Sequence, residues 1–424
     1  MTEHSVLVAG AGPAGAVAAR TLAAAGIRTL LVDRAAFPRN KPCGGGVSLR
    51  ALRRFPWLER ALAGVDVHRI SRLHLEGPER SSLDIESRDP CVLLVRRVEF
   101  DHALVRAAVD AGAELVEKFE ITQLDANDAG VTLQSRDGRR LQAPIVIAAD
   151  GVHSVIAKRT GVNARWPRTS IAIDMMEETP VETLRADRPD VLWVAYAHNG
   201  LDGYAYIFPK THHVNVGIGC LLSHYKGEMP GRPYDMQQAF VGRLVNEGAL
   251  HGRSDRRHFT PYLIPVGGPL PSAHAGRVLF AGDAGGFVHA VTAEGIYYAM
   301  VSGELAASAV VRTMANFEVR TSKSELSRAV GPGPLAVGPV YDRLWRREIG
   351  AELADAVLIQ RYLFAKHDRV SRVVRAGSSA NGLMDMLLAY VKGELSYPSL
   401  RRRMLWRFPL TVLRMAREKL AKGA

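Results

Sequence analysis

The sequence predicts a mixed fold: an α/β unit built on a parallel sheet, a β-sheet domain inserted into it, and a helical C-terminal region. Three observations predict it. Residues 5–33 read as strand, helix and strand around a glycine-rich turn, residues 170–219 alternate between apolar and polar side chains, and residues 277–283 return to a buried-strand pattern. At 424 residues the chain is too long for one small core, so we expect separate segments to assemble the first unit around the insertion.

The composition is that of an ordinary globular protein. Hydrophobic residues make up 47% of the chain and charged residues 23%, which argues against a largely disordered protein. The three cysteines, Cys43, Cys91 and Cys220, are too few for a disulfide framework and favour a reducing compartment. The first residues do not resemble a signal peptide, and the longest apolar window, residues 290–311, carries two glutamates. We therefore expect a cytoplasmic protein.

Positive charge is concentrated at the C-terminus. The net charge is +12, and the residues after 395 carry eight lysines and arginines against a single acid, Glu418. This tail suits peripheral contact with an anionic surface, either phospholipid or nucleic acid, and a solvated basic helix end explains the charge equally well. Residues 410–420 place four apolar side chains on one helical face: Val412, Leu413, Ala416 and Leu420. A helix lying on a membrane and a helix docked on the protein both fit this pattern.

The N-terminal segment forms a parallel β-α-β unit. Residues 5–9 are an apolar run rich in β-formers, residues 10–15 are a turn, and residues 16–25 are a helix that Gly26 ends. Residues 29–33 form the next strand. Because a crossover helix joins two buried apolar strands, the strands are expected to run parallel.

The later elements set the domain boundaries. Gly331 to Pro339, rich in glycine and proline, is expected to be a flexible or extended break. Helices are expected at residues 98–111 and 295–314, and strands at 114–118, 130–135, 143–149 and 277–283. We assign residues 1–65, 96–165 and 270–320 to the α/β unit, 66–95 and 166–269 to the inserted sheet, and 321–424 to the helical basic region.

The turn fits the pattern G-x-G-x-x-G that binds dinucleotides. Gly10 permits a sharp turn, Gly12 lets a pyrophosphate approach the backbone, and Gly15 lets the helix sit close to the strand. Pro13 and Ala14 lie in the turn that leads into the helix, and the free N–H groups and the positive end of the helix dipole at the helix N-terminus favour phosphates.

An acid follows at the expected distance. Asp33 ends the second strand, where a carboxylate binds a ribose hydroxyl, and an acid there argues against a 2′-phosphate. Arg34 and Arg39 flank this acid and the next loop, where they could contact phosphate or adenine or remain solvated.

Three further segments resemble flavoproteins of the p-hydroxybenzoate hydroxylase type. An Arg-x-x-Phe-Asp helix, an Asp-Gly motif and a Gly-Asp motif follow one another in the order of that family, and the last acid binds the ribityl chain of FAD in it. The resemblance implies a Rossmann-like FAD-binding domain. The residues that carry it are Arg97, Asp101, Asp150, Gly151, Gly282, Asp283, Gly295 and Ile296.

Within that superfamily the chain most resembles the geranylgeranyl reductase family. Pro42, Cys43, Gly44 and Gly45 are similar to its Pro-Cys-Gly-Gly loop, which lies by the flavin ring. Residues 203–219 resemble its Tyr-x-Trp-x-Phe-Pro segment with the following strand, and residues 341–348 resemble the start of its C-terminal helices. The sequence departs from the family at Tyr206 in place of Trp, Ala290 in place of Pro, Ala293 in place of Gly, and Asp33 in place of Glu.

The resemblance implies an FAD-dependent oxidoreductase that passes hydride to a carbon–carbon double bond of a prenyl lipid. Tyr204, Tyr206 and Phe208 alternate along one strand, and they form either an apolar wall for an isoprenoid chain or ordinary core. Cys43 is the candidate catalytic residue, and a small side chain packed on the flavin explains it as well. Water and Cys43 are both open as proton donors.

Two alternatives from the same residues stay open. A flavin-dependent monooxygenase or halogenase tailoring a natural product shares the fold, although residues 204–209 lack the paired tryptophans of a halogenase. A non-catalytic nucleic-acid or membrane binder would rest on the basic tail alone; we expect no nucleic acid.

The remaining cofactors follow from what the sequence contains. There is no second glycine-rich nucleotide fold, so the electrons would come from transiently bound NAD(P)H or from a redox protein. His212 and His213 have no further ligand at metal spacing, and we expect no metal.

Overall fold

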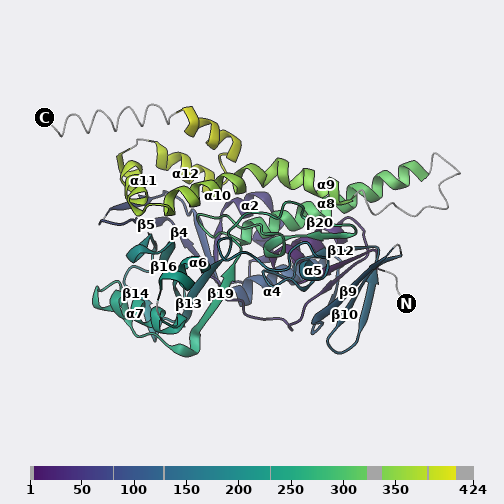
Figure 1. Ribbon diagram of the computed structural model, residues 1–424, viewed down its shortest axis with the longest axis horizontal. Helices are drawn as coiled ribbons and strands as arrows, with labels where there is room; N and C mark the ends of the chain where they lie inside the picture. The colour runs from purple at the N-terminus through teal and green to yellow at the C-terminus, as the bar shows by residue number, and fades with distance from the viewer. Residues whose placement is uncertain are drawn as a thin grey trace.

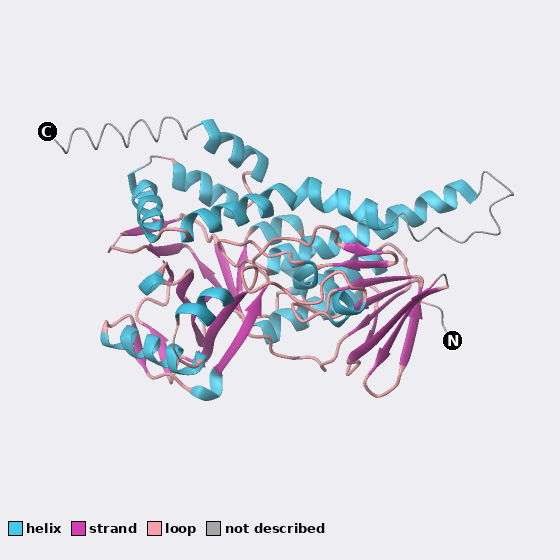
Figure 2. Cartoon of the chain, viewed as in Figure 1, coloured by secondary structure: helices cyan, strands magenta, loops and turns pink. Residues whose placement is uncertain are grey.

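The structure is a computed structural model that describes residues 4–79, 81–127, 129–229, 231–321, 337–379 and 382–406. Figure 2 shows two groups of strands at opposite ends of the molecule, with helices between them and along one side. The group at the right contains the N-terminal strand, and a long row of C-terminal helices runs along the top (Figure 1).

A six-stranded sheet carries the predicted β-α-β unit. Its strand order is β20-β21-β12-β1-β2-β8, and all neighbours pair in parallel except β20 and β21. The chain therefore returns to this sheet from three distant segments. The strands are β1 (Val6–Ala9), β2 (Thr29–Val32), β8 (Glu114–Val116), β12 (Ile145–Ala148), β20 (His274–Ala275) and β21 (Val278–Phe280).

The two faces of this sheet bury alternate residues of each strand. Val6 and Val8 of β1 pack in the core under helices α1 (Pro13–Ala24), α4 (Arg97–Asp110) and α8 (Ile296–Thr321). Leu7 and Ala9 pack on the other side, against a three-stranded sheet. That smaller sheet has the order β11-β10-β9, formed by β9 (Ile121–Asn127), β10 (Gly130–Ser135) and β11 (Arg140–Ala143).

Helix α1 begins three residues before the predicted start. Gly12 is its N-cap and Pro13 occupies the first turn, where a missing N–H leaves no helical bond unmade. The prediction placed residues 13–15 in the turn, so the first turn of the helix was wrongly assigned. Gly26, with φ of +77°, follows the helix end as predicted.

The alternating segment forms a seven-stranded sheet with the order β19-β13-β17-β16-β15-β5-β6. Its neighbours are antiparallel except β15 and β5. Strands β5 and β6 come from a segment far earlier in the chain than the other five. The strands are β5 (Arg72–Glu76), β6 (Ser82–Glu86), β13 (Ala172–Pro180), β15 (Val191–Tyr196), β16 (Gly203–Pro209), β17 (His213–Leu221) and β19 (Phe259–Ile264).

One face of this sheet packs on helices and the other faces inward. Helices α6 (Leu222–Glu228) and α7 (Pro233–Asn246) cover the first face together with a two-stranded pair, β14 (Leu184–Ala186) and β18 (Leu250–Gly252). The second face carries Leu192, Tyr206 and their neighbours, which form a separate apolar cluster.

Short elements connect the two large sheets. Strands β3 (Gly46–Ser48), β7 (Val92–Val95) and β4 (Val67–Ile70) form a three-stranded sheet in that order. Helices α2 (Arg50–Arg54) and α3 (Trp57–Ala61) follow β3, and α5 (Val155–Arg159) follows the Asp150 turn.

The C-terminal region is helical in the part that the structure describes. It contains α9 (Val337–Trp345), a π-helical turn (Arg346–Gly350), α10 (Ala351–Phe364), α11 (His367–Ser379), α12 (Leu383–Val391) and a helical segment at residues 397–406. The predicted break at 331–339 is wrong for its last residues, because 337–339 open α9 and Pro339 falls in the first helical turn. Residues 331–336 and the predicted amphipathic segment 410–420 lie outside the described residues.

A buried arginine ties these helices to the first unit. Arg50 of α2 donates to Glu352 of α10 at 2.8 Å and to the hydroxyl of Tyr390 of α12 at 2.5 Å. Tyr298 of α8 donates to the same Glu352 carboxylate. Breaking this group would leave a buried charge without its partner, so it fixes the inner ends of α10 and α12.

Helices α1 and α8 pack at backbone contact. A Cβ added at Gly303 of α8 would stand 2.1 Å from the carbonyl oxygen of Ala14 in α1, so only glycine allows this approach. In contrast, a Cβ added at Gly242 in α7 would meet nothing within 4 Å.

We expect Gly303→Ala to lower the free energy of unfolding by about 2 kcal/mol, because the added methyl group forces α8 away from α1. Gly242→Ala is the matched control and should raise stability by about 0.5–1 kcal/mol, since it removes backbone freedom of the unfolded chain without a clash. Urea denaturation of both variants measures the difference. Equal stabilities for the two variants would contradict the packing described here.

Candidate functional site

The glycine-rich turn has the geometry of a phosphate cradle. Gly10 has φ of +97°, and a Cβ there would stand 2.3 Å from the carbonyl oxygen of Ala149. A Cβ at Gly15 would stand 1.8 Å from the Gly10 carbonyl oxygen, so the helix packs tightly on the turn. Gly12 faces open space, where the nearest atom to an added Cβ is Nη2 of Arg39 at 3.7 Å. The N-terminus of α1 is therefore accessible to an anion through Gly12.

Asp33 holds this turn in place. The carboxylate follows β2, accepts a hydrogen bond from the N–H of Ala11 at 2.8 Å and accepts another from the N–H of Ala35 at 2.9 Å. The side chain is buried, whereas Arg34 beside it is exposed and lines the same cavity. Because each carboxylate oxygen can accept a further bond, Asp33 can orient the loop and still face a ribose.

A buried ion pair lies behind the turn. Arg97 donates two hydrogen bonds of 2.7 Å to Asp101, and Nη1 of Arg39 donates to the same carboxylate at 2.8 Å. Burial alone would raise the pKa of Asp101, but the guanidinium of Arg97 lowers it below the ordinary value. The pair thus stays charged, and it fixes Arg39 beside Gly12.

The Cys43 loop lies against the inward face of the seven-stranded sheet. Sγ of Cys43 accepts from the N–H of Gly45 at 3.4 Å, and Nδ2 of Asn215 in β17 donates to the Cys43 carbonyl oxygen at 3.3 Å. A Cβ added at Gly44 would stand 2.8 Å from the ring of Phe208, so the loop needs glycine there. Asn215 is fully buried in this contact. The sequence did not identify Asn215 as a site residue, because its only signal there is that of a polar residue inside an apolar strand.

The three predicted aromatic residues share one face of β16. Ring centroids of Tyr204 and Tyr206 are 6.0 Å apart, and those of Tyr206 and Phe208 are 4.6 Å apart. Tyr204 donates to the carbonyl oxygen of Thr292, and Tyr206 donates to the carboxylate of Asp174 in β13. All three rings line the cavity. Asp174 was not singled out from the sequence, where it is one acid in an alternating segment.

The remaining acids lie at the turns after two parallel strands. Asp150 follows β12 and accepts from Oγ of Ser154 at 2.6 Å, and its burial raises its pKa above the ordinary value. Asp283 follows β21 at a turn where Gly282 has φ of +60°. Nζ of Lys41 stands 3.6 Å from the Asp283 carboxylate.

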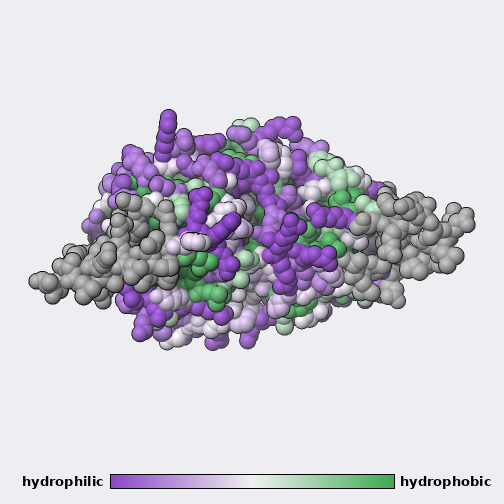
Figure 3. All heavy atoms as spheres, turned by 90° about the horizontal axis from the view of Figure 1, so that it is seen from above, coloured by the Kyte–Doolittle hydropathy of each residue, from purple (hydrophilic) through white to green (hydrophobic). Residues whose placement is uncertain are grey.

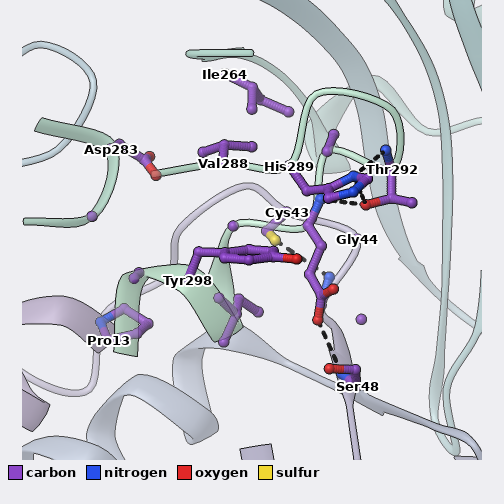
Figure 4. A pocket seen from close by; sticks show the side chains of 18 of the residues that line it. Pro13, Cys43, Gly44, Ser48, Ile264, Asp283, Val288, His289, Thr292 and Tyr298 are labelled. Atoms are coloured by element: carbon purple, nitrogen blue, oxygen red, sulfur yellow. Dashed lines mark hydrogen bonds between the residues drawn. The ribbon is translucent and has the colours of Figure 1, made fainter. Parts of the chain in front are cut away.

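These residues surround one continuous cavity of about 1150 Å³. Figure 4 shows Cys43, Asp283, His289 and Tyr298 directed into it from different segments. Of the residues predicted from the sequence to bind cofactor or substrate, all line the cavity except Gly15, which packs beneath it. Those that line it are Gly10, Gly12, Pro13, Ala14, Asp33, Arg34, Pro42, Cys43, Gly44, Gly45, Arg97, Asp150, Tyr204, Tyr206, Phe208, Gly282, Asp283, Gly295 and Ile296.

The cavity extends beyond the glycine-rich turn into an apolar region. Its walls there are side chains of the seven-stranded sheet on one side and of the C-terminal helices on the other. The sheet contributes Leu73, Leu75, Ile85, Leu192 and Val194, and the helices contribute Leu358, Ile359, Met384, Leu387, Leu388 and Val391. A long apolar molecule fits this part better than a polar one.

The other cysteines and the histidine pair do not reach this site. Cys91 and Cys220 are buried free thiols, and burial raises the pKa of Cys220 to about 12. Among the described residues, no group of three or more potential metal ligands comes together. Nor does any helix in the described ranges have the length and hydrophobicity needed to cross a bilayer.

Comparison with known proteins places these features in context. Residues 3–240 match a family described as FAD binding domain. The chain is 32% identical over 387 residues to a digeranylgeranylglycerophospholipid reductase of Methanosphaerula palustris, a match that covers 87% of this chain and 88% of the relative.

Solved structures share the fold. A geranylgeranyl bacteriochlorophyll reductase-like protein of Thermoplasma acidophilum superimposes with a TM-score of 0.75 at 20% identity, covering 95% of this chain and 98% of the other. The flavin-dependent brominase Bmp2 superimposes with a TM-score of 0.69 at 18% identity, covering 92% and 94%. At these identities the superpositions establish the architecture alone.

We expect Asp33→Ala to weaken FAD binding by about 10- to 100-fold, because the Ala11 N–H loses a charged acceptor and the turn loses its shape. Asp33→Asn keeps an acceptor of the same size and should lose less. Titration of the deflavinated protein with FAD, followed by flavin fluorescence, measures both. Unchanged affinity in Asp33→Ala would show that the carboxylate does not organise the turn.

Proposed function

The chain belongs to the FAD-binding family whose description matches residues 3–240, and we propose that it reduces carbon–carbon double bonds of a prenyl lipid. It is an FAD-dependent oxidoreductase. The substrate class is supported by the relative named digeranylgeranylglycerophospholipid reductase, which aligns over nearly the whole of both chains.

The continuity of the cavity is the observation that carries this proposal. Its polar part contains the glycine-rich turn, Asp33 and Asp283, which suit a dinucleotide, and its apolar part begins at the Cys43 loop. A substrate in the apolar part would therefore end next to the cofactor. The length and hydrophobicity of that part match an isoprenoid chain.

The residues present fit FAD. Gly12 leaves room for the pyrophosphate at the N-terminus of α1, Asp33 faces the position of the ribose, and Asp283 lies at the far end as an acceptor for ribityl hydroxyls. Bound and reduced FAD supplies the hydride. The protein supplies orientation and an apolar enclosure that excludes water.

Cys43 shapes the loop in this proposal. Its sulfur accepts the Gly45 N–H and its carbonyl oxygen accepts Asn215, so both ends of the residue are used to hold the backbone. Gly44 and the ring of Phe208 then stand in contact. These contacts favour a packing role over a reactive thiol.

The electron donor is transient. The sequence has no second glycine-rich β-α-β turn, so we propose that NAD(P)H or a redox protein reduces the flavin and then leaves.

The central test uses the holoprotein without oxygen. We expect photoreduced enzyme to be reoxidised by a geranylgeranyl lipid, with a product heavier by two hydrogens for each double bond reduced. Absorbance follows the flavin and mass spectrometry follows the lipid. A saturated prenyl lipid is the matched control and should leave the flavin reduced. Turnover that requires oxygen would instead indicate a monooxygenase or halogenase.

The mouth of the cavity suggests where the lipid enters. Leu358 and Ile359 of α10 and Met404 and Leu405 of the last described helix line the cavity and are 63%, 47%, 42% and 64% exposed. Figure 3 shows apolar side chains next to strongly hydrophilic ones on the face that carries the C-terminal helices. Arginines 401–403 are exposed on the same helix. We propose that this mouth lies on an anionic membrane surface.

We expect simultaneous replacement of Arg401, Arg402 and Arg403 by glutamate to lower binding to phosphatidylserine-containing vesicles by about 100-fold, since each basic residue near the surface contributes about 1 kcal/mol. Vesicle sedimentation at low and high salt measures the change. Glutamate at Arg136, Arg139 and Arg140, exposed on the β10–β11 hairpin, is the matched control and should bind as the wild type does. Equal losses in both triple variants would mean that only net charge matters.

A further inference from the structure

Reducing a double bond requires one proton for each hydride, and the function proposed above leaves the source of that proton unassigned. We propose that Asp174 and Tyr206 form the proton-delivery pair of this cavity. This inference rests on the proposed reductase function.

The pair is built into two neighbouring parts of the inward sheet face. Asp174 lies on β13 and Tyr206 on β16, and the strand β17 between them carries Gly217 and Gly219 at the positions that face them. The Tyr206 hydroxyl stands 3.2 and 3.1 Å from the two carboxylate oxygens of Asp174. A Cβ at Gly217 would stand 2.4 Å from that hydroxyl oxygen, so glycine makes the space for it.

The pair borders the part of the cavity expected to hold the reacting atoms. A Cβ added at Gly44 would stand 3.6 Å from the Tyr206 ring, which places the ring against the Cys43 loop. Both Asp174 and Tyr206 line the cavity, although they are only 6% and 3% exposed. A group that lines a cavity while shielded from bulk water can pass a proton to a bound molecule without losing it to solvent.

Burial keeps Asp174 from ionising fully. Its carboxylate has no ion pair with any lysine, arginine or histidine in the described part of the chain, and Lys41 is the cation whose field reaches it. Lys41 itself stands beside Asp283 and over the ring of Tyr262 at 4.6 Å. Burial raises the pKa of Asp174 to about 7, while the Tyr206 hydrogen bond and Lys41 act in the opposite direction. The carboxyl is therefore half protonated near neutral pH.

Burial also raises the pKa of three other carboxyls, which accept hydrogen bonds from groups other than Tyr206. Glu177, three residues further along β13, accepts from Thr179 and Ser254 and does not line the cavity. Asp150 accepts from Ser154, and Glu294 accepts a backbone N–H at 3.3 Å. Asp174 differs because its hydroxyl partner, Tyr206, itself lines the cavity, whereas Thr179, Ser254 and Ser154 do not.

The step balances with these groups. The protonated Asp174 carboxyl gives its proton to the Tyr206 oxygen while the Tyr206 hydroxyl gives its own proton to one alkene carbon. The electron pair of the double bond would form that C–H bond, and FAD, if bound and reduced, would supply the hydride for the second C–H bond at the neighbouring carbon. Asp174 is left as a carboxylate in the field of Lys41, and a proton from water restores it.

The first test compares Asp174→Asn with Glu177→Gln. Asparagine keeps the size of the side chain and cannot donate an acidic proton. We expect it to slow reoxidation of the photoreduced enzyme by lipid by about 100-fold or more, with FAD affinity and photoreduction unchanged. Glu177→Gln removes a buried carboxyl from the same strand outside the cavity and should keep the wild-type rate.

The second test measures the protonation state of Asp174 without turnover. Infrared titration of the oxidised holoprotein should show a protonated-carboxyl band that disappears with a midpoint near pH 7 and is missing in Asp174→Asn. The reoxidation rate should fall above the same pH, because only the protonated carboxyl donates. In Tyr206→Phe the hydrogen bond that lowers the pKa is gone, so the midpoint should move to higher pH while the rate falls. The other titratable groups near the carboxyl are Tyr204, Lys41 and Tyr262, which pairs with Asp174 across β13 and β19, and none of them is changed in these variants.

The outcomes separate this inference from the function on which it rests. If wild-type enzyme is not reoxidised by any prenyl lipid, the proposed function fails whatever the infrared band shows. If the wild type works and Asp174→Asn works equally fast with an unchanged pH profile, the pair is not the proton source. If the infrared spectra show that Asp174 stays ionised down to pH 5 in the wild type, the proposed proton-delivery pair is also overturned.

Discussion

The structure depends on how closely the backbone of α1 approaches other segments. The carbonyl of Ala14 meets Gly303 of α8, and the turn before the helix meets the carbonyl of Ala149 at Gly10. Each approach is closer than a side chain allows. Because Ala149 precedes the Asp150 turn and α8 follows the Asp283 turn, these contacts bring three distant parts of the chain around one cavity. The cavity is therefore a consequence of backbone packing as much as of the side chains that line it.

Much of this could be predicted because the signals were local. Each signal can be recognised from a few neighbouring residues: the glycine spacing, the acid after the second strand and the alternating aromatic row. The structure brings these residues together around the same cavity. Asp174 and Asn215 could not be identified in this way. Each is a polar residue within an alternating strand, and its meaning depends on which face of the sheet the Cys43 loop covers. Strand β9 was also missed, because its outward face is polar and its apolar face is short. The residues at 337–339 were assigned from their composition, yet tertiary packing makes them helical.

The two large sheets contribute different chemistry to the same cavity. The parallel sheet contributes the turns that follow its strands. These turns expose N–H groups and carboxylates, so this edge of the sheet suits phosphate and ribose. The seven-stranded sheet contributes one face, on which alternate side chains form an apolar wall that contains the carboxyl of Asp174. A reaction between a polar cofactor and an apolar substrate needs both kinds of surface. The loop from Lys41 to Gly46 lines the cavity where the two surfaces meet.

The buried Arg50 group also affects how the cavity can open. It holds α10 and α12 at their inner ends, through Glu352 and Tyr390, while Leu358 and Leu405 stand exposed further out. Nearer the mouth, Asp355 of α10 holds the last described helix through Tyr397 and Arg401. The Arg401 contact is exposed to water and salt, whereas the Arg50 contacts are largely buried, so the inner end of the cavity is held more firmly than its mouth.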